Sequence, residues 1–95
     1  MRVKIDIAAF PKLSAAIGGK ELEMNLRGPK IRDLLDDLIS KYGLNVQKML
    51  YVQNEFNPMI QIIRNGVEWI PVNRHNDPIL HEGDTLTVAV LLAGG

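Results

Sequence analysis

Three stretches of the chain alternate apolar and polar residues, which is the pattern of a strand with one buried face. They cover residues 2–8, 21–27 and 85–91. The first two are separated by a segment that ends in Gly18-Gly19, a turn signal. We therefore expect the first two strands to form an antiparallel pair joined by a rather long loop.

Residues 31–42 have the periodicity of a helix instead. Apolar residues recur there at intervals of three and four, which makes a continuous apolar stripe along one side. Pro29 suits the first turn of a helix, and Gly43 is a typical left-handed stop. We expect this segment to be the main helix, with its stripe packed on a sheet.

The second half of the chain predicts one more hairpin. Residues 44–58 have no clear period, and we expect a short helical turn or an irregular segment that covers one edge of the core. Residues 59–64 are rich in isoleucine, and the Asn65-Gly66 pair that follows is a strong hairpin signal. The chain then returns as a short strand, which its proline confines to an edge of the sheet.

Together these elements predict an α+β fold, a mixed sheet with one main helix packed on one face. The first and last strands are expected to be central and parallel. Because 95 residues are enough for a single modest core, we expect residues 1–95 to form one domain. Residues 92–95 are expected to leave it as a flexible Gly-Gly tail.

Composition narrows the function classes. The chain has 11 Lys and Arg residues and 11 Asp and Glu residues, so its net charge is zero. This charge gives no indication of binding to nucleic acid or to an acidic membrane surface. The absence of cysteine excludes disulfides, a thiolate nucleophile and cysteine-based metal sites. No apolar run is long enough to span a bilayer, and the first residues lack the apolar core of a signal peptide. We expect a cytoplasmic protein.

Two groups of polar residues are weighed as chemical sites. His75 and His81 are six positions apart with no third ligand at a defined spacing, so we expect surface imidazoles and no metal site. Asp33, Asp36 and Asp37 could form an acid–base pair. They fall on the polar face of the predicted helix, however, where solvated charges are the usual finding.

The remaining candidates are a turn residue and four large apolar residues. Asp84 follows a glycine in a predicted turn, where an aspartate normally bonds local backbone. Phe10 is expected in the core, whereas core burial and partner contact are equally favoured for Trp69. Leu91 and Leu92 stand where the chain leaves the last strand, and we expect a partner to bury them.

The chain ends in Ala93, Gly94 and Gly95. Glycine has no Cβ, so these residues form a thin, extendable tail whose carboxylate could enter a narrow channel. The five residues 91–95 reach roughly 17 Å when extended. A frayed terminus, which most domains have, is the alternative interpretation.

At this point the motifs match a known family. They are the first strand leading to Phe10, the helix, a hairpin at Asn65-Gly66, the turn at 77–84 and the final strand into Gly-Gly. The chain resembles the β-grasp (ubiquitin-like) sulfur carriers of the MoaD/ThiS-like family. The length of the segment after the helix resembles the molybdopterin synthase small subunit (MoaD-like) more than the shorter thiazole-pathway carriers.

The resemblance implies a reaction at the terminus. The Gly95 carboxylate would be adenylated and then converted to a thiocarboxylate that donates sulfur in molybdopterin (molybdenum or tungsten cofactor) biosynthesis. Ala93 and Gly94 would give the tail access to a narrow slot, and Leu91, Leu92 and Trp69 would bind the partner. No bound cofactor is expected, because the activating enzyme would use the ATP.

The resemblance also implies partners, since the chain would be no catalyst alone but the small sulfur-donating subunit of a molybdopterin synthase-type complex. They are a ubiquitin-activating-type adenylating enzyme (MoeB/ThiF-like), a molybdopterin synthase large subunit (MoaE-like) and a sulfur donor. Alternative functions are a ubiquitin-like protein modifier, a sulfur carrier for thiamine, cysteine or tRNA thiolation, and a β-grasp interaction module.

Overall fold

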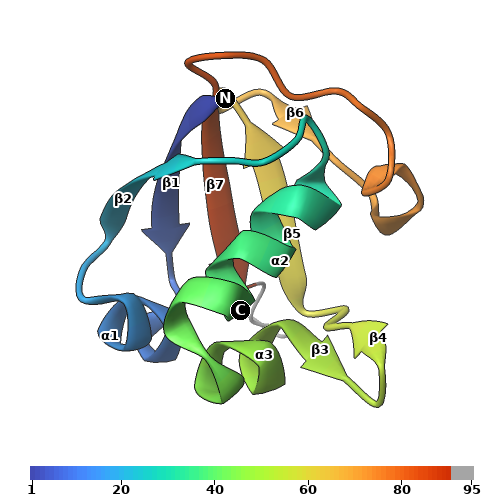
Figure 1. The fold of residues 1–95 in the computed structure, drawn as a ribbon. Helices are drawn as coiled ribbons and strands as arrows, with labels where there is room; N and C mark the ends of the chain where they lie inside the picture. The colour runs from blue at the N-terminus through green and yellow to red at the C-terminus, as the bar shows by residue number, and fades with distance from the viewer. Residues whose placement is uncertain (91–95) are drawn as a thin grey trace.

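The computed structural model describes residues 1–90, and within that range five strands form one mixed sheet in the order β2-β1-β7-β5-β6 (Figure 1). The strands are β1 (Arg2–Ala8), β2 (Glu21–Asn25), β5 (Ile60–Arg64), β6 (Glu68–Trp69) and β7 (Thr85–Val90). β1 and β7 are parallel neighbours in the interior of the sheet, and the other pairs are antiparallel. The predicted strand pairing is therefore confirmed.

Helix α2 (Ile31–Tyr42) lies across one face of the sheet, as Figure 1 shows. It begins after Lys30, whose backbone N–H donates to the Asp33 carboxylate at 3.0 Å. It ends at Gly43, which has a φ of 89° that a residue with a side chain rarely adopts. The predicted span of the main helix is thus confirmed, but Pro29 lies before the N-cap residue and not in the first turn, and the ψ of −160° at Gly43 is not that of a left-handed helical residue.

The connection between β1 and β2 contains a helix where a loop was predicted. Helix α1 spans Pro11–Ile17, with the proline in its first turn and Leu13 completely buried. Its C-cap is Gly18, a left-handed residue whose N–H bonds the Ser14 carbonyl at 3.0 Å. One buried leucine in seven residues is too little for a helical stripe, which is why the sequence pattern did not predict this helix.

The segment after α2 is more regular than predicted. It forms α3 (Leu44–Leu50) and a hairpin of β3 (Tyr51–Val52) and β4 (Glu55–Phe56). Val46 and Leu50 have no solvent exposure, so α3 covers the core as expected.

The Asn65-Gly66 hairpin is confirmed. Both residues have positive φ angles, 52° and 74°, and the Val67 N–H bonds the Arg64 carbonyl at 3.1 Å. The returning strand β6 is short, and a 3₁₀ turn at Val72–Arg74 follows it.

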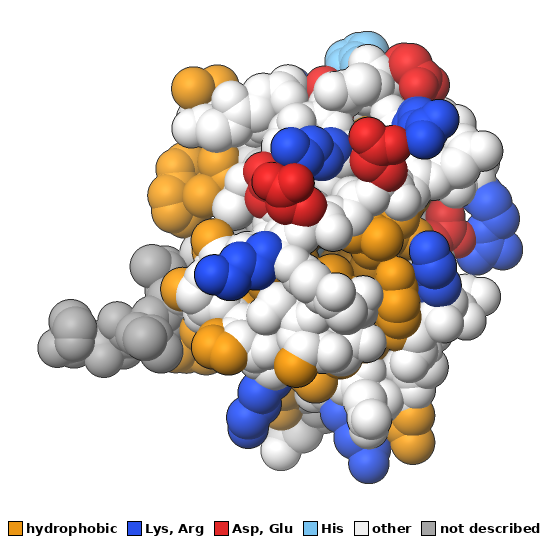
Figure 2. All heavy atoms as spheres, turned by 90° about the vertical axis from the view of Figure 1, so that its left-hand side faces the viewer, with side chains coloured by type: hydrophobic (Ala, Val, Ile, Leu, Met, Phe, Trp, Pro, Cys, Tyr) orange, Lys and Arg blue, Asp and Glu red, His pale blue; other side chains and the backbone are white. Residues whose placement is uncertain are grey.

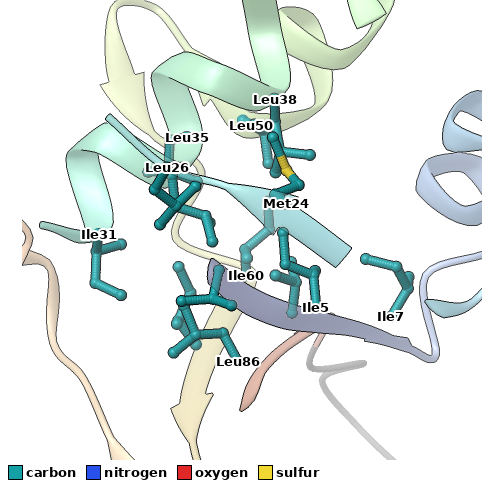
Figure 3. Close-up of a cluster of buried hydrophobic side chains, with 14 of the residues drawn as sticks. Ile5, Ile7, Met24, Leu26, Ile31, Leu35, Leu38, Leu50, Ile60 and Leu86 are labelled. Carbon is teal, nitrogen blue, oxygen red and sulfur yellow. The ribbon is translucent and has the colours of Figure 1, made fainter. Parts of the chain in front are cut away.

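The core lies between α2 and the sheet. Figure 3 shows side chains from β1, β2, α2, β5 and β7 pointing toward one another there. Completely buried members include Ile5, Ile31, Leu34, Leu35, Leu38 and Leu86. Among the described residues, no helix is long and apolar enough to cross a membrane.

Candidate functional site

The candidate site is the end of β7 together with the sheet face that no helix covers. β7 runs between β1 and β5, and its last residue, Val90, pairs with Ile60. The next five positions hold predicted site residues that lie outside the described part of the chain. These are Leu91, Leu92, Ala93, Gly94 and Gly95.

The start of β7 is fixed by a set of side-chain hydrogen bonds. Asp84, which is buried, accepts bonds from the His81 backbone N–H at 2.9 Å and from the Asn65 side-chain amide at 3.1 Å. Asn65 in turn accepts a bond from the Thr85 N–H at 2.9 Å. The predicted local role of Asp84 is confirmed, and these bonds join the turn before β7 to the β5–β6 hairpin.

One row of side chains crosses the uncovered face through all five strands of the sheet. Strand pairing places in it Glu21, Asp6, Thr87, Ile63 and Trp69, in that order. Alternate residues of a strand share a face, and the neighbours of Thr87 in β7, Leu86 and Val88, are buried in the core. This row therefore faces away from the helices, and we call the surface around it the open face.

The two aromatic candidates differ. Trp69 is 56% exposed at the edge of the open face, so core burial is wrong for most of this side chain. Phe10 is half-buried and packs against the core, as predicted. The sequence pattern could not decide whether Trp69 is buried or exposed, because an edge strand of two residues is too short to show alternation.

The open face carries small residues toward the end of β7. Ala89 pairs with Ala8 in β1 and with Gln61 in β5. Ala8 is exposed, and Met59, just before the residue that pairs with Val90, is 41% exposed. A partner can therefore approach the sheet closely at the end of β7.

The charged residues at the β2 side of the open face are largely paired. Arg2 forms an ion pair with Glu23 at 2.8 Å, and Lys4 forms one with Glu21 at 3.7 Å. Figure 2 shows side chains of both signs close to one another on the β2 side of the molecule. Asp6 is different, because its Oδ1 atom is buried and has no hydrogen-bond donor among residues 1–90.

The prediction of solvated carboxylates on α2 is wrong for one of the three. Asp37 is buried and accepts hydrogen bonds from the Arg27 side chain at 2.7 Å and from its backbone N–H at 3.2 Å. Asp36 forms an exposed pair with Arg32 at 3.2 Å, and Asp33 lies at the start of the helix. Arg27 follows β2, so tertiary structure rather than helical position decides the burial of Asp37.

The two histidines also differ. His81 is exposed, as predicted, but His75 is buried and packs edge-on against Phe56, with ring centroids 4.8 Å apart. Burial lowers the pKa of His75, and the nearby Arg32 cation lowers it further. Among residues 1–90, no three His, Cys, Asp or Glu side chains come together in a way that could hold a metal ion.

A depression of about 360 Å³ lies on the solvent side of α2 and α3, across the core from the open face. Arg32 lies over the Tyr51 ring there at 5.4 Å, and burial raises the pKa of the tyrosine hydroxyl. Because Arg32 is already paired with Asp36, the depression lacks converging free charges that would favour a ligand.

Known structures supply the comparison that sequence searches do not. No protein-family model and no curated protein sequence matches the chain. The small archaeal modifier protein 1 (SAMP1) of Methanosarcina acetivorans is 25% identical, with a TM-score of 0.76 over 99% of this chain and 96% of that one.

Two further solved structures match almost the whole chain. CysO in the BexX/CysO complex of Amycolatopsis orientalis is 22% identical, with a TM-score of 0.71 over 98% of this chain and 99% of that one. A putative molybdopterin converting factor subunit 1 from Pyrococcus furiosus is 22% identical, with a TM-score of 0.62 over 97% and 99% of the two chains. These matches confirm the β-grasp fold and support the resemblance to the sulfur-carrier family.

Proposed function

We propose that this chain, which has the ubiquitin-like β-grasp fold of sulfur carriers and small protein modifiers, is a sulfur carrier that reacts through its terminal carboxylate. A Gly95 carboxylate oxygen would attack the α-phosphorus of ATP, with pyrophosphate as the leaving group. Hydrosulfide would then attack the acyl carbon and release AMP, leaving a thiocarboxylate. The thiocarboxylate sulfur is nucleophilic, so it can be transferred to a cofactor precursor.

The observation that carries this proposal is the position of β7. The strand lies in the middle of the sheet, and it ends beside Ala8 and Met59, where the surface is open to a partner. Gly95 is five positions after Val90, a length of at most about 17 Å. An enzyme that acts on Gly95 must therefore contact the folded domain, which gives it a surface by which to recognise this carrier.

ATP-dependent activation requires a second protein. The chain's only Gly-Gly-Lys segment, at residues 18–20, lacks the pattern of a phosphate-binding loop. We propose a ubiquitin-activating-type enzyme (MoeB/ThiF-like) that docks on the open face and buries Leu91, Leu92 and Trp69. Its catalytic slot would require Ala93 and Gly94 to be small.

Within this function we propose molybdopterin as the product that receives the sulfur, with a MoaE-like large subunit as the second partner. The α3–β3–β4 segment supports this choice. Its length resembles that expected of the molybdopterin carriers, which have a longer segment after the main helix than the thiazole-pathway carriers. The similarity to a putative molybdopterin converting factor over almost the whole chain also supports it.

A second candidate function is protein modification. The similarity to SAMP1, a small archaeal modifier protein, favours it. A modifier would undergo the same adenylation, but a lysine amine would then form an isopeptide bond to Gly95. Intact mass of the protein from its native cells separates the two. Replacement of one oxygen by sulfur supports the carrier, and covalent adducts with other proteins support the modifier.

The test of the shared step compares the wild type, Gly94→Ala and a deletion of Gly95. All three should unfold within about 0.5 kcal/mol of one another, the range usual for surface changes. Deleting Gly95 moves the carboxylate back by about 3.5 Å, and a misplacement of about 1 Å can already cost a hundredfold in rate. AMP formation by the cognate enzyme should fall partly for Gly94→Ala and almost completely for the deletion. Full activation of the deletion variant would refute the proposal.

A further inference from the structure

Asp6 is a carboxylate in the middle of the open face. It lies in β1, with Glu21 of β2 opposite it on one side and Thr87 of β7 on the other. Its Oδ1 atom is buried, and no donor among residues 1–90 bonds it. A buried acceptor without a partner is costly, and a full negative charge makes the cost larger.

The charges nearest to Asp6 do not neutralise it. Lys4, two positions earlier in β1, is paired with Glu21 at 3.7 Å, and Arg2 is paired with Glu23 at 2.8 Å. Both cations of β1, Arg2 and Lys4, are therefore matched by carboxylates of β2. The charge of Asp6 remains in excess, so the centre of the face is locally negative.

The other half of the same row is apolar. Ile63 lies two strands from Asp6 and is half-buried, and Trp69 lies three strands away and is 56% exposed. At a strand spacing of about 4.8 Å, these side chains stand roughly 10 Å and 14 Å from the carboxylate. The row thus combines one unpaired negative charge with an apolar surface at a fixed distance.

We propose that the protein that binds the open face places a Lys or Arg side chain against Asp6 and an apolar side chain against Ile63 and Trp69. This assignment rests on the proposed function, because it names the chemistry by which the activating enzyme recognises the carrier. An arginine fits best, since its planar guanidinium can bond a carboxylate through two nitrogens.

The pairing gives the enzyme a means of discrimination. An enzyme surface that is apolar over Asp6 would bury the carboxylate without a counter-charge, so it would bind this carrier weakly. A carrier without an acidic residue at this position would, in turn, leave the enzyme's cation unpaired. Asp6 therefore contributes to partner choice and not to the reaction at Gly95.

The experiment measures AMP formation by the purified ubiquitin-activating-type enzyme of the same organism, at increasing carrier concentrations. It compares the wild type with Asp6→Asn and Asp6→Leu at low and high salt. Because truncating one member of an interface ion pair is costly, both variants should raise KM for the carrier at least about tenfold while kcat is kept. The wild-type KM should rise with salt, and the KM of the variants should change less.

Asp36→Asn is the matched control, since it removes the same charge from an exposed pair on α2, on the other side of the molecule. Its KM should equal that of the wild type. An unchanged KM for Asp6→Asn, or a lower KM for Asp6→Leu, would overturn the assignment while leaving the carrier function intact. Failure of the enzyme to adenylate the wild type would instead refute the proposed function, and the assignment with it. Melting curves of each variant establish that the domain is folded in every assay.

Discussion

The buried carboxylate of Asp37 and the exposed guanidinium of Arg27 form an ion pair with an N–O distance of 2.7 Å. The Arg27 backbone N–H adds a bond of 3.2 Å to the same carboxylate. The pair joins the middle of α2 to the chain that leaves β2. It therefore fixes where the main helix lies along the sheet.

Asp37→Ala should lower the free energy of unfolding by about 1–2 kcal/mol, since charged hydrogen bonds are lost but the exposed arginine is solvated. The melting temperature should then fall by roughly 4–8 °C for each kcal/mol. Asp36→Ala is the control and should cost about 0.5 kcal/mol or less, as an exposed pair within one helix does. Equal melting of the two variants would contradict the difference in burial.

Leu38 has no solvent exposure and belongs to the stripe of α2 that packs on the sheet. Leu38→Ala should cost about 2–5 kcal/mol, and Leu38→Asp should leave the domain unfolded because it buries an unpaired charge. Ser40→Asp, at an exposed position of the same helix, should melt like the wild type. Native melting of Leu38→Asp, followed by circular dichroism, would show that α2 does not pack as described.

His75 predicts a loss of stability in mild acid. Burial and Arg32 lower its pKa in the folded state, so between that pKa and the unfolded value of about 6.5 the unfolded chain binds more protons. The contribution of His75 is therefore complete above about pH 6.5 and is lost as the pH falls through the folded pKa. Denaturant unfolding from pH 7.5 to 5 should show a smaller decrease for His75→Gln than for the wild type. His81→Gln, at an exposed position, should retain the wild-type slope, and a His75→Gln slope equal to it would disprove the role of burial.

Asn65 combines a left-handed backbone with two side-chain hydrogen bonds. Asn65→Gly tolerates the φ angle but loses the bonds, so it should cost about 1–2 kcal/mol. Asn65→Ala also forces an alanine into the left-handed region and should cost about 1 kcal/mol more. Asn54 is the matched control, because it has a φ of 66° but no side-chain hydrogen bond to another described residue. Asn54→Gly should change stability little, as chemical unfolding can measure.

Trp69 should matter for binding more than for folding. Because more than half of the side chain is exposed, Trp69→Ala should lower the melting temperature only slightly, yet raise KM for activation about tenfold or more, as loss of an aromatic anchor does. Leu44→Ala, at a 60% exposed position of α3, should leave KM unchanged. Leu92→Glu should resemble Trp69→Ala. An unchanged KM for either variant would remove that residue from the interface.

Local sequence patterns were enough to predict the strands of the five-stranded sheet, the main helix and the parallel central pair, but not the β3–β4 hairpin. The strands follow from the alternation of apolar and polar residues, and the helix follows from apolar residues spaced three and four apart. Both spacings can be seen in the sequence itself. The α1 helix was missed because Leu13 is its only completely buried side chain, although Pro11 and Gly18 were correct start and stop signals. The helix start and stop signals at Pro11 and Gly18 would have predicted α1 better than its pattern of apolar residues did.

The polar residues needed tertiary information. Asp37 and His75 are buried by residues that approach from other parts of the chain, Arg27 in the first case and Phe56 in the second. The alternation in residues 2–8 does not show that Asp6 Oδ1 lacks a hydrogen-bond donor, because that depends on the side chains of the neighbouring strands β2 and β7. The sequence therefore predicted site residues in the tail, where the proposed chemistry depends on residue type alone. It could not predict the buried polar residues of the folded domain.

The parallel pairing of β1 with β7 also orders events during synthesis. β1 cannot complete its hydrogen bonds until β7 has left the ribosome, because the two strands pair directly. Contacts this distant in sequence form slowly, since the closing of a long loop precedes them. A chain interrupted before Thr85 would lack the central strand of the sheet and would remain unfolded and open to proteolysis. Folding would thus act as a check on synthesis up to β7, because only chains that include this central strand can complete the sheet.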